Sequence, residues 1–103
     1  MRYEIVLAPD AVKAYRALPA YHRAEVRDAL ERQLRQQPTR TSRSRIKRLR
    51  GLSQPQIRLR VGDVRVFYDV TIKTVEILAI VTKAEAARWL AEHGTTDAPS
   101  GTS

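Results

Sequence analysis

The feature that most constrains the fold is a run of alternating residues on both sides of the dipeptide Gly62-Asp63. Apolar and polar side chains alternate over residues 57–61, and they alternate again over residues 64–70. Such alternation is typical of strands that are buried on one face. A two-residue connection that begins with glycine is typical of a type II′ hairpin turn. The sequence therefore predicts an antiparallel hairpin whose register is fixed by this turn.

The register divides the hairpin side chains between two faces. The apolar side chains share the core face: Ile57, Leu59, Val61, Val64, Val66 and Tyr68. On the other face Arg60 lies opposite Arg65, and Arg58 lies opposite Phe67. Like charges directly opposite each other destabilise a sheet by about 0.2–1 kcal/mol, so the cluster indicates a bound anion that offsets this cost. Arg can hold phosphate through two hydrogen bonds, and Phe67 offers a stacking surface to a base. The alternative, a solvated hairpin face, is left open.

Patterns before and after the hairpin predict the other elements. A short strand is expected over residues 3–7. Pro9 suits the first turn of a helix that Pro19 ends, because proline lacks the N–H that an inner helical position requires. A second helix is expected over residues 21–37. The almost continuously apolar residues 75–81 indicate a central strand covered on both faces.

A short C-terminal helix should follow the central strand. Thr82 and Glu85 have the spacing of a capping box, and Gly94 suits the position just after a helix. Residues 95–103 have nothing to bury and are expected to form a disordered tail. The predicted fold is α+β in the order β-α-α-β-β-β-α. It is one domain over residues 1–94, a small antiparallel sheet with an N-terminal αα-hairpin packed on one face and a short C-terminal helix.

Positive charge is concentrated in one part of the chain. Residues 32–62 contain ten Lys and Arg and no Asp or Glu, so this window alone exceeds the net charge of +8. A cationic surface of this kind favours a polyanion, and nucleic acid is the first candidate. Residues 39–50 are expected to form an exposed loop. Its cations contact RNA or steer an acidic protein partner: Arg40, Arg43, Arg45, Lys47, Arg48 and Arg50, of which the last four are the expected RNA contacts.

The composition also narrows the class of protein. There is no cysteine, so disulfides and thiolate zinc sites are excluded, and two distant histidines do not make a metal site. No apolar run approaches the roughly 20 residues of a membrane helix. We therefore expect a cytoplasmic protein with no membrane partner, no metal and no small-molecule cofactor.

Residues 57–68, IRLRVGDVRVFY, resemble the R-x-R-V-G-x-Y-R-V-x-Y core of RelE/ParE-superfamily toxins of bacterial type II toxin–antitoxin pairs. The opening strand, the helix ending in Leu-Pro, the long second helix and the Leu-Arg-Gly before the hairpin match as well. The resemblance covers about residues 3–93. It implies a small α+β domain and, for RelE-like members, cleavage of mRNA in the ribosomal A site.

The resemblance also implies roles for individual residues. Arg65 falls at the family's hairpin arginine, Arg58 at a basic position of the preceding strand, and Lys83 at a basic position after the last strand. These three are the expected catalytic residues. The reaction implied is attack of a ribose 2′-OH on the adjacent phosphate, with an arginine stabilising the phosphorane-like transition state. The expected RNA contacts are the four loop cations from Arg45 to Arg50 together with Arg60, Phe67 and Arg88.

Three functions are left open by the sequence. The first is a RelE-like, ribosome-dependent mRNA endoribonuclease that inhibits translation. The second is a ParE-like poison of DNA gyrase, which is allowed because residues 81–89 lack the Tyr or His that many active nucleases carry there. The third is a catalytically degenerate member that only binds antitoxin and co-represses its operon. Under each of them the expected partner is a cognate acidic antitoxin. Trp89 is expected in the core or lining the antitoxin groove, and Tyr68 is expected to pack.

Overall fold

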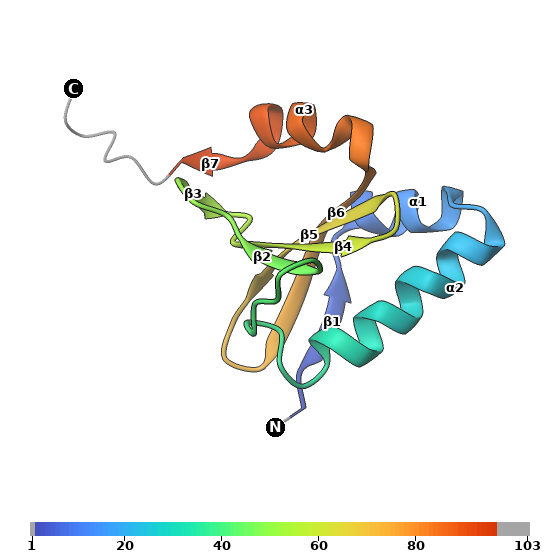
Figure 1. Ribbon diagram of the computed structural model, residues 1–103, viewed down its shortest axis with the longest axis horizontal. Coiled ribbons are helices and arrows are strands. Elements are labelled where there is room, and N and C mark those ends of the chain that lie inside the picture. The colour runs from blue at the N-terminus through green and yellow to red at the C-terminus, as the bar shows by residue number, and fades with distance from the viewer. Residues whose placement is uncertain (1, 97–103) are drawn as a thin grey trace.

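The computed structural model describes residues 2–96 as two helices, a mostly antiparallel sheet and a third helix (Figure 1). The helices are α1 (Pro9–Ala17), α2 (Ala20–Ala29), which continues into the π-helical segment η1 (Leu30–Leu34), and α3 (Lys83–His93). The strands are β1 (Glu4–Leu7), β2 (Ile46–Arg48), β3 (Leu52–Gln54), β4 (Ile57–Val61), β5 (Val64–Val70), β6 (Thr74–Thr82) and β7 (Thr95–Thr96). The predicted α+β class and αα-hairpin are confirmed.

The central hairpin has the predicted register. Strands β4 and β5 are antiparallel, with Val61 opposite Val64, and Gly62 has a φ of 57°. No described non-glycine residue has a positive φ, so Asp63 takes the negative φ that follows glycine in a type II′ turn. The alternating pattern therefore specified both the turn and the faces of the two strands.

The five-stranded sheet has the order β1-β6-β5-β4-β2, and one of its pairings differs from the prediction. Strand β1 runs parallel to β6, whereas an antiparallel sheet was expected. A parallel neighbour is possible here because the chain returns to β6 through helices and four strands rather than through a tight hairpin. Strand β6 lies between β1 and β5, which confirms its central position.

Two short strands form where the sequence indicated loop and tail. Residues of the expected loop 39–50 form β2, which pairs with β4 because Ile46 is buried against the core and faces Leu59. Thr95 and Thr96, expected in the disordered tail, form β7 and pair with β3 in a separate two-stranded sheet. The rest of the expected tail, residues 97–103, lies outside the described residues.

The hydrophobic core lies between the sheet and the α1–α2–η1 layer. Helical residues Ala11, Val26, Leu30 and Leu34 meet the apolar face of the sheet, which includes the fully buried Tyr68. The Tyr68 phenol donates a hydrogen bond of 2.7 Å to the carbonyl of Pro38, as suits a packing residue. Helix α3 lies on the opposite side of the sheet (Figure 1). Of the described helices, none is long and apolar enough to cross a membrane.

Helix α3 begins without a loop and ends at a glycine. Thr82 is both the last residue of β6 and the N-cap of α3, and the predicted capping box with Glu85 is present. Gly94 follows directly after the last residue of α3, as predicted, and has a φ of −71°. Glycine is required here for space, because a Cβ at this position would lie 2.6 Å from the carbonyl oxygen of Leu90.

Candidate nucleic-acid interface

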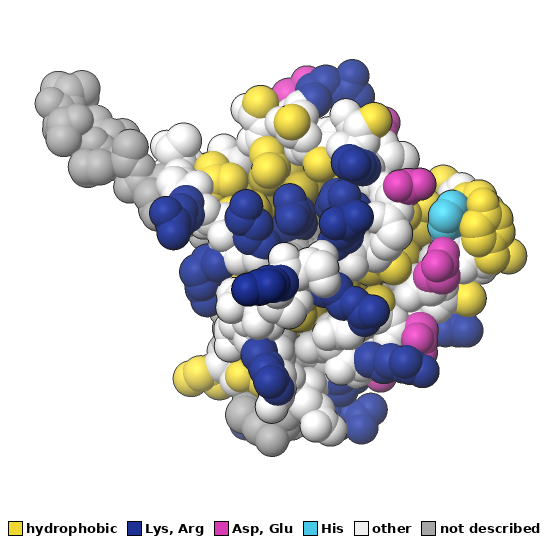
Figure 2. Space-filling view, viewed as in Figure 1, with side chains coloured by type: hydrophobic (Ala, Val, Ile, Leu, Met, Phe, Trp, Pro, Cys, Tyr) yellow, Lys and Arg dark blue, Asp and Glu magenta, His cyan; other side chains and the backbone are white. Residues whose placement is uncertain are grey.

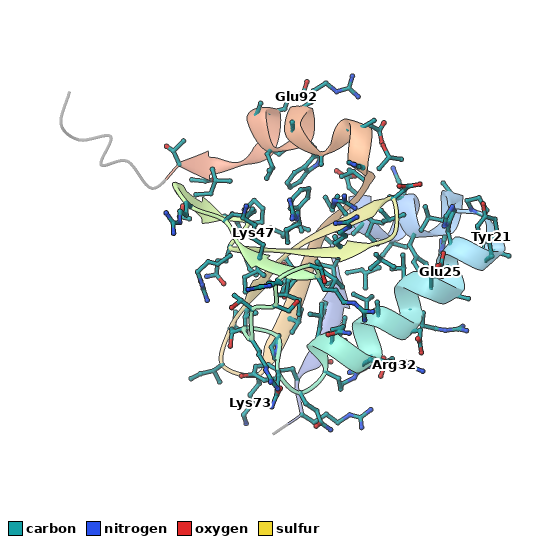
Figure 3. The ribbon with its side chains drawn as sticks, in the orientation of Figure 1. Tyr21, Glu25, Arg32, Lys47, Lys73 and Glu92 are labelled. Carbon is teal, nitrogen blue, oxygen red and sulfur yellow. The ribbon has the colours of Figure 1, made fainter. Side chains whose placement is uncertain are left out.

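Four cations share the sheet face that points toward α3. Arg60 lies opposite Arg65, as predicted, and Lys47 of β2 lies opposite Arg58. Side-chain direction alternates along a strand, so all four point away from the α1–α2 core. We call these residues, Lys47, Arg58, Arg60 and Arg65, the cationic face. Figure 2 shows Lys and Arg side chains gathered over the sheet below α3, and Figure 3 places Lys47 on the side facing that helix.

Arg65 is the buried member of the cationic face. Its side chain is 6% exposed, and its Nη1 donates hydrogen bonds to the carbonyls of Gly62 at 2.8 Å and Val64 at 3.2 Å. Burial lowers the pKa of this guanidinium, and the charges of Arg58 and Arg60 lower it further. The lowered pKa means that the charged form of Arg65 is disfavoured at this position, and a bound anion would stabilise that form.

Arg58 has an unsatisfied donor. Its side chain is partly buried, and its Nε is buried without a hydrogen-bond partner within residues 2–96. Over the same residues, no Lys or Arg of the cationic face forms a salt bridge. Buried polar groups are usually hydrogen-bonded, so a buried donor without a partner adds to the cost of gathering unpaired cations on this face.

The stacking surface expected at Phe67 is not open, and this expectation is wrong for the described structure. Phe67 is fully buried, and the Trp89 ring of α3 stacks on it with centroids 5.2 Å apart and an interplanar angle of 6°. His93 continues the stack, 5.1 Å from Trp89. The capping box at Thr82 indicated that a helix starts directly at the end of β6, but it did not indicate which face of the sheet this helix covers.

The remaining predicted RNA contacts divide into two groups. Arg45 lies beside the cationic face, since its carbonyl accepts a hydrogen bond of 2.7 Å from the Arg60 amide. Arg48 lies opposite Ile57 and therefore points to the other side of the sheet from Lys47. Arg50 is exposed in the turn that leads to β3.

The two predicted site residues on α3 also stand apart from the sheet cluster. Lys83 is exposed in the first turn of α3, and its amide donates a hydrogen bond of 2.7 Å to the carbonyl of Asp63 in the hairpin turn. Lys83 therefore lies at the same end of the sheet as Arg65. The Arg88 side chain is 71% exposed and lies 3.9 Å from Glu85, so it does not join the cationic face.

Two carboxylates on the α3 side of the sheet, Asp69 and Glu85, are already engaged. Asp69 is buried, and its two oxygens accept hydrogen bonds from the Gln56 amide at 2.7 Å and the Gln54 side chain at 2.8 Å. Glu85 accepts from the Thr82 hydroxyl in the capping box. The described residues contain no cluster that could hold a metal ion. The face can therefore bind and stabilise negative charge, while Asp69 and Glu85 are held in structural roles.

Comparisons with known proteins place this fold. A family model described as the ParE toxin of a type II toxin–antitoxin system, parDE, matches residues 5–87. The structure is similar to a chain of the archaeal RelE–RelB complex from Pyrococcus horikoshii, with 30% identity, a TM-score of 0.60, and coverage of 81% of this chain and 97% of that chain.

Two further solved structures share the fold. A chain of the toxin–antitoxin complex RelBE2 from Mycobacterium tuberculosis is 24% identical, with a TM-score of 0.65 and coverage of 80% of this chain and 99% of that chain. A double arginine-to-alanine mutant of the Escherichia coli toxin RelE in the free state is 24% identical, with a TM-score of 0.70 and coverage of 89% and 94%. Among curated proteins, none matches the chain.

Proposed function

The chain belongs to the ParE toxin family of type II toxin–antitoxin systems, and from this premise we propose that it is a RelE-like, ribosome-dependent mRNA endoribonuclease acting in the cytoplasm. The observation that carries the proposal is the pairing of Arg60 with Arg65 and of Lys47 with Arg58 on one sheet face. Four unpaired cations at this spacing suit the phosphates of an RNA strand. The structural similarity to RelE chains supports the same class of activity.

The chemistry assigned to the cationic face is electrostatic. In the proposed reaction the ribose 2′-OH attacks the adjacent phosphorus and loses its proton to water, the bond to the leaving 5′ oxygen breaks, and that oxygen takes up a proton from water. The products are a 2′,3′-cyclic phosphate and a 5′-OH. Arg58, whose side chain is only partly buried, donates to a non-bridging phosphate oxygen through the accessible part of its guanidinium. Arg65 is held by two carbonyls, so its charge is fixed in place before the phosphorane-like state forms. Arg60 and Lys83 hold the neighbouring backbone.

An antitoxin is the proposed protein partner. The solved relatives from Pyrococcus horikoshii and Mycobacterium tuberculosis are toxin–antitoxin complexes. The excess of cations in residues 32–62 favours an acidic segment that folds across the toxin. Such a segment would neutralise the toxin by covering the cationic face.

The proposal is tested by replacing the two central arginines. Arg58→Ala and Arg65→Ala should each lower inhibition of cell-free translation by about 100-fold, the usual effect of removing a donor that stabilises developing charge. Arg16→Ala, an exposed position on α1, is the matched control and should inhibit as the wild type does. Thermal unfolding must show each variant folded. Full inhibition by both variants would contradict the proposal.

A ParE-like gyrase poison is the second candidate. It is favoured by the match to the ParE toxin family model and by the engagement of Asp69 and Glu85 in structural hydrogen bonds. In this candidate the cationic face binds its target without cleaving RNA. Purified protein that blocks supercoiling by DNA gyrase, and leaves translation and mRNA unchanged, would establish this function in place of the nuclease.

A further inference from the structure

A polar pocket of about 530 Å³ lies outside the cationic face, between η1 and the segment leading to β2. Its volume falls within the roughly 300–1,000 Å³ typical of ligand sites. Two guanidiniums and three carboxamides line it, with Ile46 at its wall: Arg32, Gln33, Gln36, Gln37 and Arg40. We call it the η1 pocket. Figure 3 shows Arg32 at the opposite end of the α2–η1 helix from Tyr21.

Most of the hydrogen-bonding capacity of the η1 pocket is free. Arg32 uses its Nε in an ion pair of 3.3 Å with Asp28, and its side chain remains 75% exposed. Arg40 donates one hydrogen bond of 3.0 Å to the Gln37 carboxamide. Gln33 and Gln36 make no side-chain hydrogen bond within the described residues. No Asp or Glu lines the pocket, so it presents net positive charge together with neutral donors and acceptors.

The η1 pocket and the cationic face lie on opposite sides of one edge strand. Ile46 and Lys47 are consecutive in β2, so their side chains point to opposite sides of the sheet. Strand β2 is at the end of the strand order and has no neighbour beyond it. A flexible polymer that lies on the cationic face reaches the pocket by crossing this edge.

We propose that the η1 pocket binds a ribose-phosphate unit of single-stranded RNA. The arginines suit a phosphate, and the carboxamides both donate and accept, as a ribose 2′-OH does. A carboxylate side chain only accepts hydrogen bonds, whereas the phosphate and 2′-OH of one nucleotide together match both the guanidiniums and the carboxamides, so the lining suits RNA. The inference depends on the proposed function only in taking RNA as the class of ligand.

The test measures binding of the full chain to a labelled 12-nucleotide RNA and to the DNA of the same sequence. Arg32→Gln/Arg40→Gln should weaken RNA binding about tenfold and lower the salt-dependence slope by about 1.4, or about 0.7 for each phosphate that is no longer neutralised. Lys13→Gln/Arg16→Gln removes the same charge from exposed positions of α1 and is the matched control. It should change affinity less than twofold.

A variant with unchanged charge distinguishes specific binding of RNA in the η1 pocket from non-specific electrostatic attraction. Gln33→Leu/Gln36→Leu should weaken RNA binding about threefold, leave the salt slope unchanged and reduce the preference for RNA over DNA. An effect of the arginine pair equal to that of the α1 control, or no effect of the glutamine pair, would overturn the proposal. So would a loss of antitoxin binding with RNA binding intact, which would assign the pocket to an acidic peptide.

Two further measurements identify the source of the RNA and separate this inference from the proposed function. If the pocket variants bind the free oligonucleotide more weakly, the ligand is a message strand. If they bind the oligonucleotide normally and only co-sediment less with ribosomes, the ligand is ribosomal RNA. Both outcomes support a ribose-phosphate ligand. Wild-type protein that binds RNA through the η1 pocket and fails to inhibit translation would refute the nuclease and leave the pocket in place.

Discussion

Arg60 and Arg65 lie opposite each other on neighbouring strands. This pairing lowers the stability of the fold and provides two positive charges for the proposed binding of phosphate. A like-charged cross-strand pair is destabilising, and the lowered pKa of Arg65 has the neighbouring guanidiniums among its causes. Nothing in the packing requires Arg60, which is exposed. Residues that destabilise a fold without packing in it are expected to be retained for binding.

Arg60→Gln should therefore raise stability and lower activity. Removing one of two opposed charges should stabilise the fold by about 0.2–1 kcal/mol, measured by urea unfolding at low salt, and the gain should shrink in high salt. Inhibition of translation should fall in the same variant. Arg16→Gln on α1 is the control and should change neither property. A destabilised Arg60→Gln protein would show that the side chain has a structural role.

Tyr68 makes stability depend on pH at the alkaline end. Burial raises the pKa of its phenol above the ordinary value of 10.0. Above about pH 10 the unfolded chain loses this proton while the folded chain keeps it, so folding stability should fall by roughly 1.4 kcal/mol per pH unit. Tyr68→Phe, which also loses the hydrogen bond to Pro38, should be less stable at pH 7 by about 1 kcal/mol. The difference from the wild type should narrow between about pH 10 and pH 11, and parallel pH curves would refute the assignment.

At the scale of elements, α3 is the most weakly attached helix on the described surface. It has no buried residue, and it is held at its start by the capping box and at its middle by the stack of Trp89 on Phe67. Elements with few buried contacts open locally at lower free energy than the core. Opening of α3 would expose Phe67 beside the cationic face.

Thr82→Ala tests this local stability. Loss of an N-cap costs about 1 kcal/mol, so amide exchange in α3 should speed up by roughly fivefold, while exchange in β5 and β6 stays as in the wild type. Thr39→Ala, another exposed threonine, is the control and should leave all rates unchanged. Equal acceleration throughout the sheet would mean that α3 and the core unfold together.

The elements also show what sequence alone can specify. Alternation and the Gly62 turn fix the β4–β5 register, because a shift of one residue would bury Arg60 and expose Leu59. Strand β2 has no such pattern. It has three residues and one buried side chain, Ile46, and it forms only because β4 supplies a partner. Such short strands carry no pattern of their own, and β3 pairs with β7 across about forty residues, so β2, β3 and β7 were missed.

The candidate site was predictable to the same extent. Period-two alternation by itself assigns Arg58, Arg60 and Arg65 to one face of the hairpin. The covering of Phe67 depends on which way α3 folds after Thr82, and that choice is made by tertiary packing. The addition of Lys47 to the face required the unpredicted strand β2.

For the whole molecule, the net charge of +8 matters less than its arrangement. Residues 32–62 supply cations to three places: the cationic face, the η1 pocket and exposed turns. Charges in all three steer polyanions from a distance, whereas only ordered cations can bind phosphates in fixed positions. The two contributions can be separated by variants of equal net charge.

Lys47→Gln/Arg60→Gln and Arg43→Gln/Arg50→Gln each lower the net charge from +8 to +6. The first pair lies on the cationic face, and the second pair lies in exposed turns. Both should slow association with RNA at low salt by similar amounts, because steering depends on total charge. Only the first should speed dissociation and reduce inhibition of translation, by about tenfold, since only it removes ordered phosphate contacts. Equal dissociation rates for the two variants would mean that RNA binding depends on the total charge of residues 32–62. The fixed positions of Lys47 and Arg60 on the sheet would then have no role of their own.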